Sequence, residues 1–246
     1  MKKLLFIWAV CLLLLSAASA IAESTAVMVY MCGSNLESLY GSATNDLQEM
    51  LLSGLNAGET QVFIMTGGSR EWMDGTISAE ETRIYTLSAK AHGGGLKMKL
   101  VDSTSSRNMG EAETLSYFLN FCAEYGKADR RALILWDHGG GPVNGVCWDE
   151  NFGTDHLSLE EITAALSQSP FSQDKLEWIG FDACLMSSVE VASKLAPYAK
   201  YMISSQAEEP ASGWDYSFLK GLENDAGGRG HGPAHHRRLF CGQAPV

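Results

Sequence analysis

The stretch Leu176–Met186, L-E-W-I-G-F-D-A-C-L-M, and the earlier stretch Ala132–Gly141, A-L-I-L-W-D-H-G-G-G, together decide the fold. Each is an apolar run of the length of a buried strand, and each ends at a reactive side chain, Cys184 in one and His138 in the other. A helical pattern over Ser158–Leu166 separates them, which is the spacing of a β-α-β unit. Parallel strands in such a unit bring their carboxyl ends to the same edge of the sheet. The sequence therefore predicts a thiol beside an imidazole, as a cysteine nucleophile with a histidine base requires.

The residues that follow each strand end strengthen this hypothesis. Three glycines follow His138, and glycine lets backbone approach a substrate and leaves N–H groups free to bind an oxyanion. A helix is predicted over Leu185–Leu195, and the backbone N–H groups at its start would stabilise a Cys184 thiolate. Taken alone, each residue has a structural alternative, as a buried thiol or an ordinary histidine. Their pairing at two strand ends favours catalysis.

The rest of the chain alternates strand and helix patterns. This order predicts an α/β fold with a mostly parallel sheet and helices on both faces. Strands are predicted at Ala26–Cys32, Gln61–Thr66, Arg83–Leu87, Leu96–Val101, Ala132–Trp136, Leu176–Phe181 and Tyr201–Ser205. Besides the helix over Leu185–Leu195, helices are predicted at Leu36–Leu52, Glu111–Tyr125 and Ser158–Leu166. The last of these opens on the capping-box pair Ser158 and Glu161.

The composition narrows the class of protein. The 246 residues suffice for one α/β domain, and the hydrophobic share of 46% with 19% charged residues is that of a globular chain. A formal net charge of −11 argues against nucleic-acid binding and suits an extracellular protein or an enzyme that accepts cationic substrates. Outside the first 22 residues the cysteines are widely spaced, without CxxC pairs, so they indicate neither a disulfide scaffold nor a zinc site; they are Cys32, Cys122, Cys147, Cys184 and Cys241.

The two ends of the sequence differ from the middle. Lys2 and Lys3 precede the apolar run Leu4–Leu15 and small residues, which predicts a secretory signal peptide over residues 1–22 and an extracytoplasmic protein. The run is too short for a spanning helix and gives no sign of a lipid anchor. Residues 223–246 form an atypical segment with no apolar periodicity, which predicts an unfolded or frame-shifted tail. Residues 23–222 are left as the folded domain.

Six segments of the chain resemble the clostripain-like cysteine peptidases, relatives of the caspases, legumains and gingipains. They are V-M-V-Y-M-C-G-S-N-L-E, A-T-N-D-L-Q-E-M, N-M-G-E-A-E-T-L, A-L-I-L-W-D-H-G-G-G, I-G-F-D-A-C-L-M-S-S-V-E-V-A and E-E-P-A-S-G-W-D-Y, between residues 26 and 220. The resemblance implies a caspase-like α/β/α sandwich, His138 as base and Cys184 as nucleophile. It also implies that the N–H groups of Gly139 and Cys184 bind the oxyanion. The activity implied is that of a secreted endopeptidase that cuts after basic residues.

Asp182 is the candidate for substrate selection. The resemblance implies that it faces the first specificity pocket and selects Arg, and sometimes Lys, because a buried carboxylate binds a guanidinium through two hydrogen bonds. Its structural alternative is a turn-capping carboxylate. Glu208 and Glu209 are candidates for the same pocket, with a solvated loop as the alternative. Asp137 is interpreted as structural, because neighbours at a strand end point to opposite faces.

Two departures from the family pattern bear on activity. Relatives are often activated by a cut after a basic residue between the histidine and the cysteine, whereas here that stretch holds only Lys175. Relatives also usually continue with ordered chain beyond G-W-x-Y, where this sequence has the atypical segment. An alternative function is therefore a non-catalytic or truncated pseudoenzyme that serves as a secreted binding domain.

A third hypothesis is a metal-dependent hydrolase that uses His138, Asp149 and Asp155, although these residues lack compact ligand spacing. For the favoured peptidase, the chemistry requires no cofactor or catalytic metal, with calcium as an optional structural ion. The expected partners are peptides or proteins with basic residues, and neither nucleic acid nor a membrane.

Overall fold

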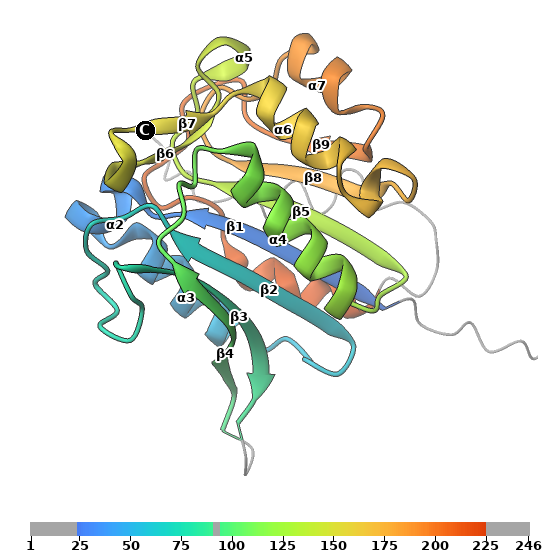
Figure 1. Cartoon of the computed structure of the whole chain (residues 1–246). Coiled ribbons are helices and arrows are strands. Elements are labelled where there is room, and N and C mark those ends of the chain that lie inside the picture. The colour runs from blue at the N-terminus through green and yellow to red at the C-terminus, as the bar shows by residue number, and fades with distance from the viewer. Residues whose placement is uncertain (1–23, 91–93, 225–246) are drawn as a thin grey trace, which may run out of the picture.

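The computed structural model describes residues 24–90 and 94–224 and is built on a seven-stranded sheet (Figure 1). The strand order is β4-β3-β2-β1-β5-β8-β9, in which β1, β2, β5, β8 and β9 are parallel and β3 runs antiparallel to both of its neighbours. The strands are β1 Thr25–Cys32, β2 Thr60–Gly67, β3 Glu81–Ala89, β4 Leu96–Ser105, β5 Arg130–Trp136, β8 Leu176–Asp182 and β9 Ala199–Ile203. A separate hairpin joins β6 Val146–Asp149 to β7 Asp155–Leu157.

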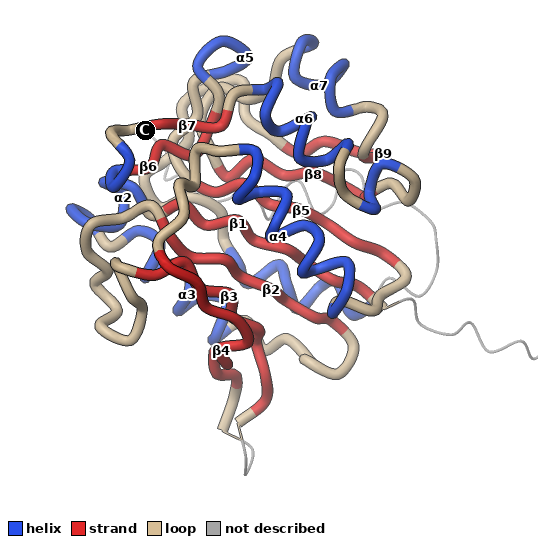
Figure 2. The backbone as a smooth tube through the Cα atoms, in the orientation of Figure 1, coloured by secondary structure: helices blue, strands red, loops and turns tan. Residues whose placement is uncertain are grey.

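Helices cover both faces of the sheet, as Figure 2 shows for α4 and α6 on one side and α3 on the other. The α-helices are α2 Ser34–Tyr40, α3 Ser42–Leu52, α4 Ala112–Tyr125, α5 Gly141–Asn144, α6 Leu159–Ser167 and α7 Val189–Leu195. The 3₁₀ segments are η1 Glu150–Phe152, η2 Pro170–Ser172 and η3 Tyr216–Asn224. The α/β/α sandwich and the mostly parallel sheet that the sequence predicts are therefore confirmed.

The central strand β1 explains why the fold has two cores. All eight of its residues are buried, as expected for a parallel strand covered on both faces. Met28 and Tyr30 point into the core under α4, α6 and α7, whereas Val27 and Val29 point into the core under α3 and η3. This period of two fixes which side chains at the strand ends face each layer.

Three local predictions need correction. The single helix predicted over Leu36–Leu52 is two helices, because Gly41 adopts a left-handed φ of +66° that ends α2 and starts α3. The β6–β7 hairpin was not predicted, since its strands are only four and three residues long. The helix expected from Leu185 begins instead at Val189, where Ser188 caps it. The capping box at the start of α6 is confirmed.

Leu185 itself has a φ of +64° and precedes the first residue of α7 by four positions. Cys184 therefore does not lie at a helix N-terminus, and that part of the sequence hypothesis is wrong. The predicted signal peptide over 1–22 and all but the first two residues of the predicted tail fall outside the described residues. Within the described residues, no helix has the length and apolar character needed to cross a bilayer.

Candidate active site

The structure brings His138 and Cys184 to adjacent strand ends, as the sequence predicts. In the parallel pair β5–β8, Trp136 lies opposite Asp182. His138 and Cys184 each lie two residues beyond this pair. The two strand ends also touch through their backbone. A Cβ placed on Gly139 would lie 2.0 Å from the carbonyl oxygen of Cys184, so only glycine fits there. The predicted oxyanion residues, Gly139 and Cys184, are therefore in direct backbone contact.

His138 is held by a residue that the sequence analysis missed. Its Nε2 lies 2.7 Å from Oδ1 of Asn35, at the start of α2 and just beyond the end of β1. An amide oxygen only accepts hydrogen bonds, so Nε2 carries the proton and Nδ1 of the neutral ring is left as the acceptor. Partial burial lowers the pKa of His138, which favours this neutral form. The contact with Asn35 therefore holds the ring in place and leaves its other nitrogen able to accept a proton.

The Cys184 thiol receives its support from a loop and not from a helix. The backbone N–H of Glu209, in the segment after β9, donates to Sγ of Cys184 at 3.2 Å. The N–H of Leu185 donates to the carbonyl of Ala207 at 3.1 Å, which ties the turn after the cysteine to the same loop. The thiol remains partly exposed, whereas Cys32, Cys122 and Cys147 are buried. Among the described cysteines, Cys184 alone combines access with a hydrogen-bond donor aimed at its sulfur.

Buried carboxyl groups gather next to this thiol. Asp182 accepts hydrogen bonds from Tyr216 Oη at 2.9 Å and from Trp214 N at 3.3 Å. Asp46, on α3, accepts from Nε1 of Trp136 at 2.7 Å. A Cβ on Gly213 would lie 3.1 Å from an oxygen of Asp182 and 3.1 Å from one of Asp46, so both carboxyl groups border the same glycine.

Glu209 completes this group, which we call the carboxyl cluster: Asp46, Asp182 and Glu209. Nε1 of Trp214 donates to Glu209 Oε1 at 3.4 Å, and the Glu209 carboxyl group lies against that of Asp182. Among residues 24–90 and 94–224, no lysine or arginine forms an ion pair with any of the three. The cluster therefore lacks a cationic partner within the described protein.

The electrostatics of the cluster follow from this lack of a cation. Burial raises the pKa of Asp46, Asp182 and Glu209 above the usual carboxyl range. Repulsion from the charge of Asp182 raises the pKa values of Asp46 and Glu209 further. A guanidinium or ammonium group in the cluster would reverse both effects.

The remaining predicted residues take separate places. Glu208 is exposed and has no hydrogen bond to the cluster, so the structure groups Glu209, but not Glu208, with Asp182. Asp137 is buried and accepts from Ser34 Oγ at 2.5 Å and from Trp148 N at 2.6 Å. Burial raises its pKa to about 8. Its role is structural, as predicted, because it ties the end of β5 to α2 and to β6.

The metal hypothesis finds no support in the described part of the chain. Asp149 accepts from Met109 N at 2.8 Å, and Asp155 accepts from Asn108 Nδ2 at 2.6 Å, so both carboxylates already hold protein donors. No group of three or more His, Cys, Asp or Glu among these residues is placed to hold a metal ion. The reactive groups that the described residues bring together are a thiol, an imidazole and a carboxyl cluster.

Fold and site together define a class, that of caspase-like α/β/α proteins with a histidine and a cysteine at neighbouring strand ends. The family model described as the clostripain family matches residues 29–229, and the chain belongs to this family. The clostripain of Hathewaya histolytica is 28% identical over 192 residues, which are 69% of this chain and 36% of that protein. This chain thus spans about a third of the length of that relative.

Solved structures share the fold. A secreted C11 cysteine protease from Bacteroides thetaiotaomicron, in complex with an irreversible peptide inhibitor, has a TM-score of 0.65 at 21% identity, over 81% of this chain and 53% of that one. An inactive zymogen C11 protease from Parabacteroides distasonis has a TM-score of 0.64 at 24% identity, over 83% of this chain and 56% of that one. These matches cover about half of each solved chain.

Proposed function

We propose that this chain is a cysteine endopeptidase that hydrolyses peptide bonds after basic residues, with arginine preferred over lysine. The observation that carries the proposal is the carboxyl cluster beside the Cys184 thiol. Buried carboxyl groups without a cation are costly, and a cationic side chain of a substrate is the partner that they lack. The guanidinium of arginine binds two carboxylate oxygens at once, whereas the ammonium of lysine is a point charge.

The dyad residues have complementary roles in this reaction. Cys184 Sγ attacks the carbonyl carbon of the peptide, and His138 takes the thiol proton. The N–H groups of Gly139 and Cys184 stabilise the oxyanion that forms. His138 then gives its proton to the leaving amine, and water hydrolyses the remaining thioester with His138 again as base. Asn35 acts as a positioning residue, because its contact with Nε2 fixes the ring while Nδ1 exchanges the proton.

The reaction as proposed needs neither a cofactor nor a metal ion, and calcium is left as an optional structural ion. We infer export through the N-terminal segment 1–22, which has the charge and hydropathy pattern of a signal peptide. The proposed partners are peptide or protein substrates with basic residues. Hydrolysis that is retained in the presence of a chelator rules against a catalytic metal. Stability measured with and without calcium tests for a structural ion.

A thiol-reactive peptidyl probe that ends in arginine tests the proposal. We expect the probe to alkylate Cys184, and an otherwise identical probe ending in leucine to react far more slowly. Cys184→Ala removes the labelled atom, and His138→Ala removes the base, so both variants are expected to lose peptide hydrolysis almost completely. A circular-dichroism spectrum confirms that each variant is folded. A folded wild-type chain that neither reacts with the arginine probe nor cleaves arginine peptides would support the pseudoenzyme instead.

A further inference from the structure

His138 borders a recess that it forms with residues of several other elements. It is a cleft of about 870 Å³, and its lining includes His138, whereas no residue of the carboxyl cluster contributes to it. Its walls come from α2, the loop after β2, and the β6 region; they include Asn35, Leu39, Arg70, Trp148 and Glu150. The cleft is therefore separate from the carboxyl cluster that is proposed to bind arginine.

The order of the strands fixes where a substrate meets this cleft. Along the carboxyl edge the strands lie in the order β2, β1, β5, β8 and β9 (Figure 1). The segments that follow these strands in the chain carry, in the same order, Arg70, Asn35, His138, Cys184 and Glu209. The imidazole thus lies between the cleft and the nucleophile. In peptide hydrolysis the base protonates the leaving amine, which belongs to the residue after the cleaved bond.

We propose that this cleft binds the residues that follow the cleaved bond and prefers an apolar or aromatic side chain at the first or second of them. This inference rests on the proposed peptidase function. With the arginine side chain on the β8–β9 side, the leaving half of the peptide must pass across His138 toward β1 and β2. It then enters the cleft directly.

The lining explains the preference for an apolar side chain. Leu39 is 62% exposed, so its side chain is available for contact. The half-buried indole of Trp148 is stacked on the ring of His156, with centroids 5.2 Å apart and an interplanar angle of 21°, so it forms a rigid wall. Arg70 and Glu150 form an ion pair at 3.1 Å and neutralise each other. Glu71 is exposed to solvent at the rim.

Quenched fluorogenic peptides that differ only after the arginine test this subsite. We expect kcat/KM to be about 5- to 10-fold higher with Phe or Leu after the cleaved bond than with Gly, as partial burial of one such side chain provides. Leu39→Ala should reduce this Phe-to-Gly ratio to about twofold. The matched control is Leu52→Ala, on α3, where the side chain is 84% exposed and outside the cleft; the ratio should stay at its wild-type value.

Equal rates for all residues after the bond, a preference for lysine there, or an unchanged ratio in Leu39→Ala would each overturn the inference. An arginyl-coumarin amide, which has no amino acid after the cleaved bond, keeps the two proposals distinguishable. If the wild-type chain cleaves it while the peptides show no preference, the subsite alone is wrong. If the folded chain cleaves neither the amide nor any peptide, the peptidase function is wrong and the subsite is rejected with it.

Discussion

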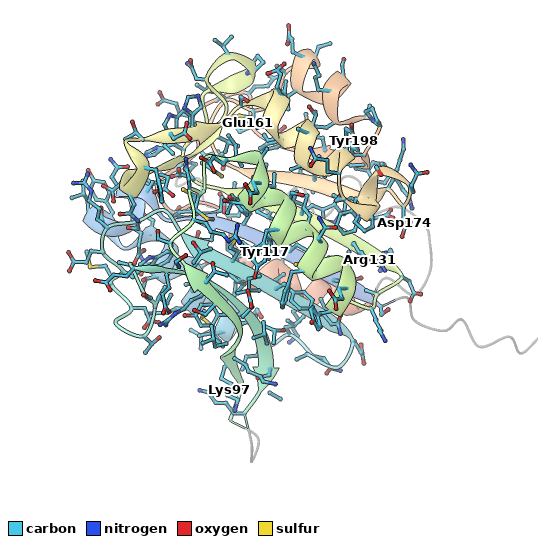
Figure 3. All side chains as sticks on the ribbon, in the orientation of Figure 1. Lys97, Tyr117, Arg131, Glu161, Asp174 and Tyr198 are labelled. Carbon is cyan, nitrogen blue, oxygen red and sulfur yellow. The ribbon has the colours of Figure 1, made fainter. Side chains whose placement is uncertain are left out.

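The two ends of the strand pair β5–β8 differ in whether their carboxyl groups have a cationic partner. At the amino end, Arg131 and Asp174 form an ion pair at 2.8 Å, which Figure 3 shows at the surface, and the Asp174 side chain is 73% exposed. At the carboxyl end, Asp182 is buried next to Asp46 with no described cation beside it. An exposed pair costs little and gains little, whereas a buried unpaired carboxyl group lowers stability. The proposed function accounts for this difference, because a cationic side chain of a substrate is the partner that the buried carboxyl groups lack.

Replacement of Asp182 should have the largest effect on substrate selection. Asp182→Asn keeps the shape and removes the charge, so it is expected to lower kcat/KM for arginine substrates by about 10- to 150-fold, the value of a charge-assisted contact. Matched leucine substrates should change much less. Kinetics on Arg, Lys and Leu substrates, beside a thermal melt, provide the measurement. If the Arg-to-Leu ratio persists and only stability drops, Asp182 is a turn cap and the comparison fails.

Loss of the contact to the His138 ring should have a smaller effect. Asn35→Ala is expected to lower kcat about tenfold with little change in KM, because the ring loses its fixed orientation but the carboxyl cluster is intact. It should also shift the acidic limb of the kcat/KM profile. Asn35→Asp offers an acceptor at the same place and should restore part of the rate while raising the pKa of the imidazole. A variant with reduced stability and an unchanged pH profile would show a merely structural role.

The pH dependence should follow the buried carboxyl groups. Burial raises the pKa of Asp182 to about 6 and that of Glu209 to about 8, so both carry more charge as the pH rises. The ratio of kcat/KM for arginine to that for leucine substrates is therefore expected to increase several-fold between about pH 5 and pH 8. A flat ratio across this range would mean that the cluster does not bind the cationic side chain.

Stability should change in the opposite direction over the same range. A carboxyl group whose folded pKa is raised stabilises the fold below its unfolded pKa of about 4, and this stabilisation is lost as the pH rises through the folded value. The melting temperature should therefore fall from about pH 4 toward pH 8. A small arginine amide that binds the cluster should offset part of that fall.

The smallest effect is expected at the amino end. Asp174→Ala should change the free energy of unfolding by about 1 kcal/mol or less, since the Asp174 side chain of this ion pair is 73% exposed, and it should leave kcat/KM unchanged. Chemical denaturation with a linear extrapolation measures the change. The reciprocal Arg131→Ala variant, which also removes a side chain that is only 23% exposed, is the control for lost packing. A loss of activity in either variant would show that the two ends of the strand pair are coupled.

Much of this arrangement could be predicted from the sequence because it depends on local patterns. Apolar runs located β5 and β8, and the parallel order placed His138 beside Cys184. Asn35 and Asp46 could not be found in this way, because they reach the site from α2 and α3 through tertiary packing alone. The start of α7 was also missed, since the left-handed Leu185 depends on its bond to the distant Ala207 and not on helix propensity.

Glu209 contacts both the Cys184 thiol and the rest of the carboxyl cluster. Its main-chain N–H reaches the sulfur of Cys184, while its side chain lies with Asp182 and receives a hydrogen bond from Trp214. A displacement of this loop by an ångström or two lengthens both contacts together. A backbone movement that takes Glu209 away from the carboxyl cluster therefore also removes the donor to the sulfur. The rate of thiol alkylation and the affinity for arginine should therefore change together when the backbone at Glu209 moves.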